Sequence, residues 1–339
     1  MATATQAQVT PERILQMARG YVPPLVLEAA IRHRVFDVLD AGPMSVAEVA
    51  KATGTSVRGL TAIMNALVGL QFLTKDGEER YALAPESAAF LVSTKPSFQG
   101  GLIRHCSEHL IPRWLHLNDV VATGAPVSAV NAEQSGGTFF HDFVVDILPM
   151  SFPAAQFLAG HLQFGEAGGP VRVLDLAAGS GVWGIVQAQA SPRVQVTAVD
   201  WPEVIPVTRK TVERFGVSER FTYVEGDLRD ADFGSGYALA TLGHILHSEG
   251  EARSRALLAK VFAALESGGT IAIAEFLVNQ DRTGPLTGLF FAVNMLVNTD
   301  HGNTWSFEEI SGWLREAGFT NPRTVPSPGA SPLILATKA

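Results

Sequence analysis

The hydrophobic and polar positions change their period about halfway along the chain. Up to about residue 162, apolar residues recur every three or four positions, and the first clear set follows Pro23 and Pro24. After residue 170, short apolar runs alternate with longer segments of helical period. This alternation predicts a parallel sheet that is covered on both faces by helices. We expect strands at 171–176, 194–199, 221–225, 237–242, 270–276 and 332–337, and helices at 181–190, 203–215, 251–265 and 307–317.

The first hundred residues have the outline of a winged helix. Ser45 and Glu48 have the spacing of a capping box, which predicts the start of a short helix that ends near Gly54. A second helix is expected at 57–70, followed by two short strands around an Asp-Gly turn. The second helix offers Arg58 as its one cation, so we expect it to pack against protein rather than bind DNA.

A glycine-rich break at 165–170 separates the two periods and is the best candidate for a domain boundary. We therefore expect a mainly α winged-helix domain at 1–100, connecting helices at 101–165 and a Rossmann-like α/β domain at 166–339.

The composition narrows the class of protein further. The formal net charge of −8 argues against general nucleic-acid binding, which needs clustered lysine and arginine. Cys106 is the one cysteine, which excludes an internal disulfide and fits a reducing cytosol. The N-terminus has no apolar run of the secretory type, and the apolar stretch at 288–297 is too short to span a bilayer. These features predict a cytoplasmic protein. His105 and His109 lack an evident third ligand, so we expect no metal site.

Glycines and acids follow the first three expected strands of the second half. Asp175 ends the first strand, and a loop containing Gly179 and Gly181 leads into a helix, where glycine lets the backbone approach a ligand closely. Asp200 ends the next strand, about 20 residues past the glycines, where a carboxylate can accept both ribose hydroxyls of an adenosine ligand. Asp227 follows the third strand and is expected to accept the adenine amino group, with the side chains against the ring supplied by Trp201 and Leu228.

A glycine loop alone would also suit a nicotinamide dinucleotide, or merely form a tight turn beside solvated acids. Asp175 lies within the loop motif, where it would repel a pyrophosphate but not a cationic sulfonium amino acid. The loop also lacks the full dinucleotide spacing. Both features favour S-adenosylmethionine as the ligand.

The chain resembles, over nearly its whole length, a family of S-adenosylmethionine-dependent O-methyltransferases that includes plant caffeate-type and bacterial polyketide-tailoring and hydroxyneurosporene-type enzymes. The motifs that carry the resemblance are VLDLAAGSG, VDWP, EGDL, ILHSEGEA, IAIAEF and FEEISGWLREAGF. The resemblance implies a class I methyltransferase fold, with a mostly parallel sheet whose last strand is antiparallel, and an N-terminal winged-helix domain that forms a homodimer.

The resemblance also implies the catalytic residues. His247 occupies the position of the general base, and an imidazole can accept a phenolic proton near neutral pH. Glu275 matches an acid of the family, whereas two further positions that commonly hold acids are Ser248 and Thr304 here. The other reading of His247 is a helix-start residue with a cap or surface role.

The remaining expected contacts lie beside this base. Gly243 and His244 are expected at the cofactor edge, although His244 could equally be a packed core residue. By analogy with the family, the acceptor pocket is lined by Met150, Phe291, Met295 and Asn298, an apolar surface that suits a planar phenol.

These observations predict methyl transfer to a hydroxyl of a small aromatic or polyketide-like acceptor. N- or C-methylation, or a cofactor-dependent reaction without methyl transfer, is the alternative on the same fold. A winged-helix regulator with a ligand-sensing α/β domain is the third reading, and the low basic charge counts against it.

Overall fold

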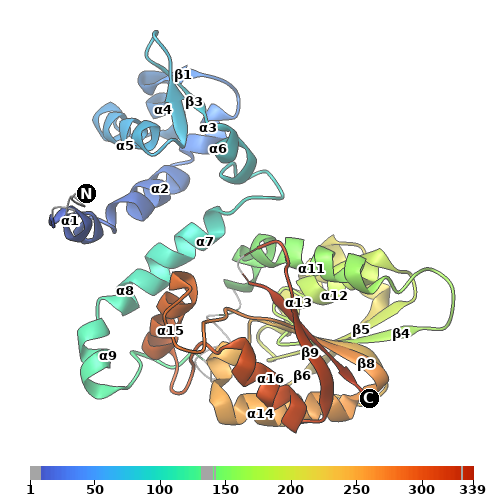
Figure 1. Ribbon diagram of the computed structural model, residues 1–339. Coiled ribbons are helices and arrows are strands. Elements are labelled where there is room, and N and C mark those ends of the chain that lie inside the picture. Colours follow the sequence, from blue (N-terminus) through green and yellow to red (C-terminus); the bar gives the residue numbers. More distant parts are fainter. Residues whose placement is uncertain (1–8, 131–139, 141–142, 330) are drawn as a thin grey trace, which may run out of the picture. The chain divides into compact units, whose positions relative to one another are not determined.

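The computed structural model describes residues 9–130, 140, 143–329 and 331–339, and its elements are shown in Figure 1. The chain forms two compact units, Met1–His109 and Leu110–Ala339. The boundary between the two units falls within the connecting helices expected at 101–165. The helices α8 (Ile111–Trp114) and α9 (Leu117–Thr123) contact α15 (Leu286–Asn298) and so belong with the sheet unit.

The first unit has the helices and the hairpin that the sequence predicts. Its elements are α1 (Glu12–Ala18), α2 (Val22–Arg32), α3 (Val35–Leu39), β1 (Met44–Ser45), α4 (Val46–Thr53), α5 (Val57–Gly69), β2 (Leu73–Lys75), β3 (Arg80–Leu83), α6 (Pro85–Phe90) and α7 (Gly100–His105). The three strands pair antiparallel in the order β1-β3-β2. The capping box of α4 is present, because the Ser45 backbone N–H donates to Glu48 Oε2 (2.7 Å) and the Glu48 N–H donates to Ser45 Oγ (3.4 Å).

Helix α1 has no buried residue, although four of its seven side chains are apolar. Ile14 and Met17 are 72% and 70% exposed, and Tyr21, just before α2, is 64% exposed. An apolar helix surface of this kind is uncommon on a protein that works as a monomer.

The second unit contains a seven-stranded sheet in the order β6-β5-β4-β7-β8-β10-β9. The strands are β4 (Val171–Leu176), β5 (Val194–Asp200), β6 (Phe221–Glu225), β7 (Tyr237–Gly243), β8 (Leu265–Ala274), β9 (Phe319–Val325) and β10 (Leu333–Lys338). The strands from β6 to β8 are parallel, and β10 runs antiparallel to both β8 and β9. The expected fold, a mostly parallel sheet with an antiparallel last strand, is confirmed.

Helices cover both faces of this sheet (Figure 1). Alternate strand residues divide between two cores, so that Val173 belongs to one and Leu174 to the other. The first core includes α11 (Leu148–Leu162), α12 (Val182–Ala190) and Val212 of α13 (Ile205–Arg214). The second core includes α14 (Leu246–Ala264) and α16 (Phe307–Glu316).

Three elements differ from the sequence expectation. Strand β9 was not predicted, because it is largely exposed and contains Pro322, and so lacks an apolar alternation. Helix α15 was noted only as an apolar stretch. Helix α14 begins five residues early, since a turn that starts at Leu246 continues through a non-helical Gly250 (φ 74°, ψ 167°) into the expected helix.

Candidate active site

The strand order reverses between β4 and β7, which are adjacent parallel strands at the centre of the sheet (Leu176 pairs with Leu242). In open α/β sheets, ligands bind outside the carboxyl ends of the strands at such a point. The glycine loop lies here, with left-handed backbone at Gly179 (φ 55°) and Gly181 (φ 77°). The structure thus brings the predicted loop to the expected edge.

Asp175 is buried and bonded within the protein. Its Oδ2 accepts the Gly184 N–H (3.0 Å), and its Oδ1 accepts the Thr241 hydroxyl (2.7 Å). Burial raises the pKa of Asp175 to about 7. These contacts tie β4 to the first turn of α12 and to β7, so the carboxylate supports the loop from beneath.

Asp200 joins the end of β5 to the glycine loop. Its Oδ2 accepts the Gly179 N–H (2.7 Å), and its Oδ1 accepts the Trp201 N–H (2.8 Å). Burial raises the pKa of Asp200 to about 6, against the effect of these two hydrogen bonds. An ionised carboxylate has about four lone-pair positions. Each oxygen of Asp200 therefore keeps one acceptor position for a ligand.

Asp227 lies just past β6, and Arg229 forms a two-pronged contact with it. The Arg229 Nε donates to Asp227 Oδ1 and its Nη2 donates to Oδ2, each at a distance of 2.8 Å. Leu228 is half-buried beside them. The arginine was not singled out by the sequence analysis, because a cation two residues after an acid is common on protein surfaces.

Trp183 is a second residue that sequence reasoning missed. Its indole lies over the Cα of Gly243, such that a Cβ added to this glycine would stand 2.0 Å from Nε1. Trp183 is buried on the first turn of α12, two positions past Gly181. Glycine at the end of β7 therefore makes room for this ring at the switch point of the sheet.

His244 packs at the same edge with a left-handed backbone (φ 61°). Its Nε2 lies 2.7 Å from Ser331 Oγ, and its ring centroid is 5.0 Å from that of Phe276. Burial lowers the pKa of His244 to about 4, so the ring is neutral at physiological pH.

His247 and Glu275 form a buried pair. The Nδ1 of His247 lies 2.7 Å from Glu275 Oε1, and the His247 backbone N–H donates to Oε2 (3.1 Å). Glu275 is 0% exposed and His247 is 8% exposed. Burial opposes ionisation of Glu275, but the charge and hydrogen bond of His247 outweigh it and hold the pKa of the carboxyl below its usual value.

Ser248 and Thr304, which stand where the family commonly has acids, both donate hydrogen bonds to backbone carbonyls. The Ser248 hydroxyl donates to the Ile245 carbonyl (2.9 Å), and the Thr304 hydroxyl donates to the Gly288 carbonyl (3.2 Å). Within the described residues, Glu275 is the one carboxylate that contacts the His247 ring.

Two of the four predicted pocket residues gain definite contacts. Phe291 meets His247 edge-on, with ring centroids 4.8 Å apart. Asn298 is buried and its Oδ1 accepts from Arg113 Nη1 (3.0 Å), while its Nδ2 donates to the Asn294 carbonyl (2.8 Å), so its polar atoms are bonded to protein. Met295 is buried on the same helix, and Met150 is half-buried on α11.

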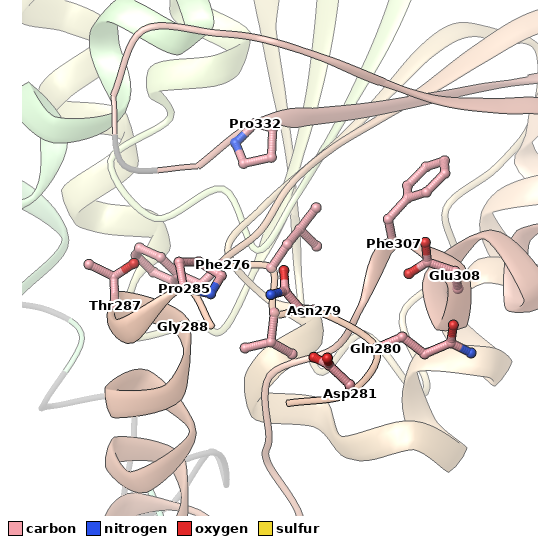
Figure 2. Close-up of a pocket in the computed structure, with 12 residues that line it drawn as sticks. Phe276, Asn279, Gln280, Asp281, Pro285, Thr287, Gly288, Phe307, Glu308 and Pro332 are labelled. Atoms are coloured by element: carbon pink, nitrogen blue, oxygen red, sulfur yellow. The ribbon is translucent and has the colours of Figure 1, made fainter. Parts of the chain in front are cut away.

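A cavity of about 850 Å³ lies next to this cluster (Figure 2). Phe276 contributes to its wall and packs against Phe291, with ring centroids 4.3 Å apart and ring planes tilted by 38°. In Figure 2, Phe276 and Pro285 lie at one end, and Glu308 from the start of α16 lies at the other. Neither His247 nor any of the four predicted pocket residues lines it.

The fold and the edge define a Rossmann-like α/β protein with a nucleoside-type site beside a buried histidine–glutamate pair. The O-methyltransferase domain family matches residues 167–320, and the O-methyltransferase dimerisation domain family matches residues 15–93. The chain therefore belongs to the O-methyltransferase family, and the expected class, an S-adenosylmethionine-dependent methyltransferase, is confirmed.

Relatives align over almost the whole chain. A 3-hydroxy-5-methyl-1-naphthoate 3-O-methyltransferase from Streptomyces sahachiroi is 30% identical, over 97% of this chain and 96% of the relative. A tetracenomycin polyketide synthesis 8-O-methyltransferase from Streptomyces glaucescens is 28% identical, over 97% of both. The structure of PigF with SAH has a TM-score of 0.83 at 27% identity, over 97% of this chain and 100% of PigF.

None of the helices in the described part of the chain has the length and hydropathy needed to cross a bilayer. Within the same ranges, no three histidine, cysteine, aspartate or glutamate side chains are grouped as a metal site requires.

Proposed function

We propose that this enzyme transfers the methyl group of S-adenosylmethionine to a hydroxyl of a small aromatic or polyketide-like acceptor, with His247 as general base. The observation that carries the proposal is the contact of His247 Nδ1 with the fully buried carboxylate of Glu275 (2.7 Å). A carboxylate accepts hydrogen bonds only, so Nδ1 carries the proton and Nε2 keeps a lone pair.

The chemistry follows from this tautomer. The bound cofactor supplies a methyl group that is already electrophilic, so the enzyme must mainly align the acceptor and increase the nucleophilicity of its oxygen. Nε2 of His247 takes the hydroxyl proton, and the charge of Glu275 stabilises the imidazolium that forms.

The acceptor class is supported by the rings around the base and by the relatives. Phe276 and Phe291 both lie against His247, and aromatic side chains favour stacked or edge-on contacts with a planar ring. The two Streptomyces relatives are named for a naphthoate and for a polyketide.

The residues of the sheet edge fit the cofactor. The two remaining acceptor positions of Asp200 match two ribose hydroxyls, and Asp227 with Leu228 and Trp201 suits an adenine ring. Gly179, Gly181, Gly243 and His244 would border the methionine end, with Asp175 holding the loop from below.

We also propose that the first unit forms a homodimer. The dimerisation-domain match covers residues 15–93, and the apolar side chains of α1 are exposed. The cytoplasmic location and the absence of a nucleic-acid partner stay predictions.

The test is the turnover of His247→Ala on a panel of phenols, followed with isotopically labelled cofactor and mass spectrometry. A positioned base typically contributes a factor of about 10²–10⁴, so we expect a loss of that order with little change in cofactor affinity. The loss should shrink at high pH, where a phenol ionises unaided. Near-normal turnover of His247→Ala at neutral pH would instead favour an amine or carbon acceptor. This alternative stays open because Ser248 and Thr304 stand where the family commonly has acids.

A further inference from the structure

The Asp227 carboxylate is held by three N–H donors of one residue. The Arg229 backbone N–H donates to Oδ1 (2.9 Å), Nε to Oδ1 and Nη2 to Oδ2. Asp227 is 7% exposed, whereas the Arg229 side chain is 57% exposed. The buried partner is therefore fixed in place by an arginine that reaches in from the surface, and two-pronged contacts of this kind set both the position and the plane of a carboxylate.

Helix α14 fixes the segment that carries the pair. The Lys260 ammonium donates to the backbone carbonyls of Leu228 (2.9 Å) and Arg229 (3.2 Å). Arg253 lies 4.0 Å from Asp227 Oδ1 and is bound to Glu249, also on α14. The neighbouring charges thus include three cations, Arg229, Arg253 and Lys260, and one anion, Glu249. Burial opposes the ionisation of Asp227, but the contacts with Arg229 outweigh it and lower the pKa of Asp227.

The hydrogen bonds leave a defined acceptor position. Oδ1 already accepts two N–H groups, whereas Oδ2 accepts one. Because each carboxylate oxygen has about two lone-pair positions, one position on Oδ2 stays available to a ligand. It suits a single N–H donor, and it repels a carbonyl oxygen.

We propose that Arg229 is a positioning residue that directs Asp227 Oδ2 at the exocyclic amino group of the cofactor's adenine, and so sets the preference for adenine over a 6-oxopurine. This inference rests on the proposed cofactor site. Without the guanidinium, the carboxylate can rotate and its desolvation beneath a purine is no longer offset by an adjacent cation.

The experiment is calorimetric titration with S-adenosylhomocysteine and with S-inosylhomocysteine, in which a carbonyl replaces the amino group. We expect the wild-type protein to prefer the adenosyl compound by roughly 10- to 100-fold, the range for a buried polar mismatch. Arg229→Met, which keeps the length of the side chain, should lower this preference by about 3- to 10-fold. Arg255→Met is the matched control, since it removes another ion-paired arginine of the same unit and should leave the preference unchanged.

Asp227→Asn gives a second readout, because an amide can rotate to donate to a carbonyl. It should shift the preference towards the inosyl compound, which a general loss of folding cannot do. A wild-type preference in Arg229→Met would overturn the role of Arg229, and equal wild-type affinities for both compounds would overturn the role of Asp227. Failure of the wild-type protein to bind either compound would count against the cofactor site itself.

Discussion

Burial and charge have opposing effects on the ionisation of Glu275. A fully buried carboxylate is costly to ionise, yet the contact with His247 holds it ionised. The pair joins the first turn of α14 to the residue that follows β8, and the two residues lie 28 positions apart in the sequence. The interaction depends on the negative charge of Glu275, which a substitution by glutamine removes without changing the size of the side chain.

Glu275→Gln tests the orienting role of this carboxylate. The carboxylate accepts the His247 N–H on Oε2 and the Phe276 N–H on Oε1, whereas an amide has a single oxygen, so it loses one of these contacts and gives the imidazolium no compensating charge. We expect turnover to fall by about 10- to 100-fold, less than for His247→Ala, with the affinity for S-adenosylhomocysteine within about threefold of wild type. Steady-state kinetics and calorimetry on the same preparation separate the two. A larger change in affinity than in turnover would assign Glu275 to cofactor binding.

Asp200 predicts a pH dependence of cofactor affinity. Its pKa, raised to about 6 by burial, means that the carboxylate is protonated below that pH and loses acceptor capacity for the ribose hydroxyls. Affinity for S-adenosylhomocysteine should therefore rise between pH 5 and pH 7 and level off above, by up to about tenfold per unit below the pKa. Calorimetry at constant ionic strength measures this slope. Asp200→Asn should bind weakly with a flatter profile, and a wild-type profile flat over this range would contradict the prediction.

At the scale of elements, α12 packs against β7 through the indole ring of Trp183, which lies over Gly243. Trp183 occupies the space over Gly243 that any larger residue would fill. The contact joins the helix after the glycine loop to the strand that ends four residues before His247. The position of α12 on the sheet therefore depends on glycine at this one place.

Gly243→Ala tests that dependence. The new methyl group would lie 2.0 Å from Trp183 Nε1, so the ring or the strand must move, and overpacking of this kind costs about 1–3 kcal/mol of unfolding free energy. Denaturant unfolding measures the cost. The double variant Gly243→Ala/Trp183→Leu should recover part of it, since the smaller side chain removes the collision. Additive effects of the two substitutions would show that the contact does not determine the packing.

At the scale of the whole molecule, the apolar side chains of α1 are exposed to water unless another protein surface covers them. The helix buries none of its residues within its own chain as described, and the matching family is a dimerisation domain. Obligate interfaces between copies are large and apolar. We therefore expect this surface to be covered by a second copy of the chain, as in the proposed homodimer.

Ile14→Glu combined with Met17→Glu should convert a dimer into monomers, because two charges placed in an apolar interface cannot be solvated there. Light scattering coupled to size exclusion at micromolar concentration measures the mass. Val57→Glu, which alters a half-exposed apolar residue of α5, serves as the control for surface charge. A wild-type protein that is already monomeric and active would contradict the dimer.

Local sequence patterns predicted most of the elements of the sheet unit and the edge of the sheet where the cofactor is expected. Apolar period and capping residues act over a few positions, so the capping box at Ser45, the parallel strands and the acids at their ends were predictable. Where local periodicity was weak, as in the exposed edge strand β9, the prediction failed.

The pairing of the side chains became visible in the folded structure alone. The sequence could not tell that Asp175 is bonded from two elements, that Arg229 holds Asp227, or that Trp183 lies over Gly243. Such contacts depend on rotamers and on the close packing of segments up to 66 residues apart, where a shift of an ångström makes or breaks a hydrogen bond. Residue types predict which chemistry a sheet edge can support, and packing decides which of those groups remain available to a ligand.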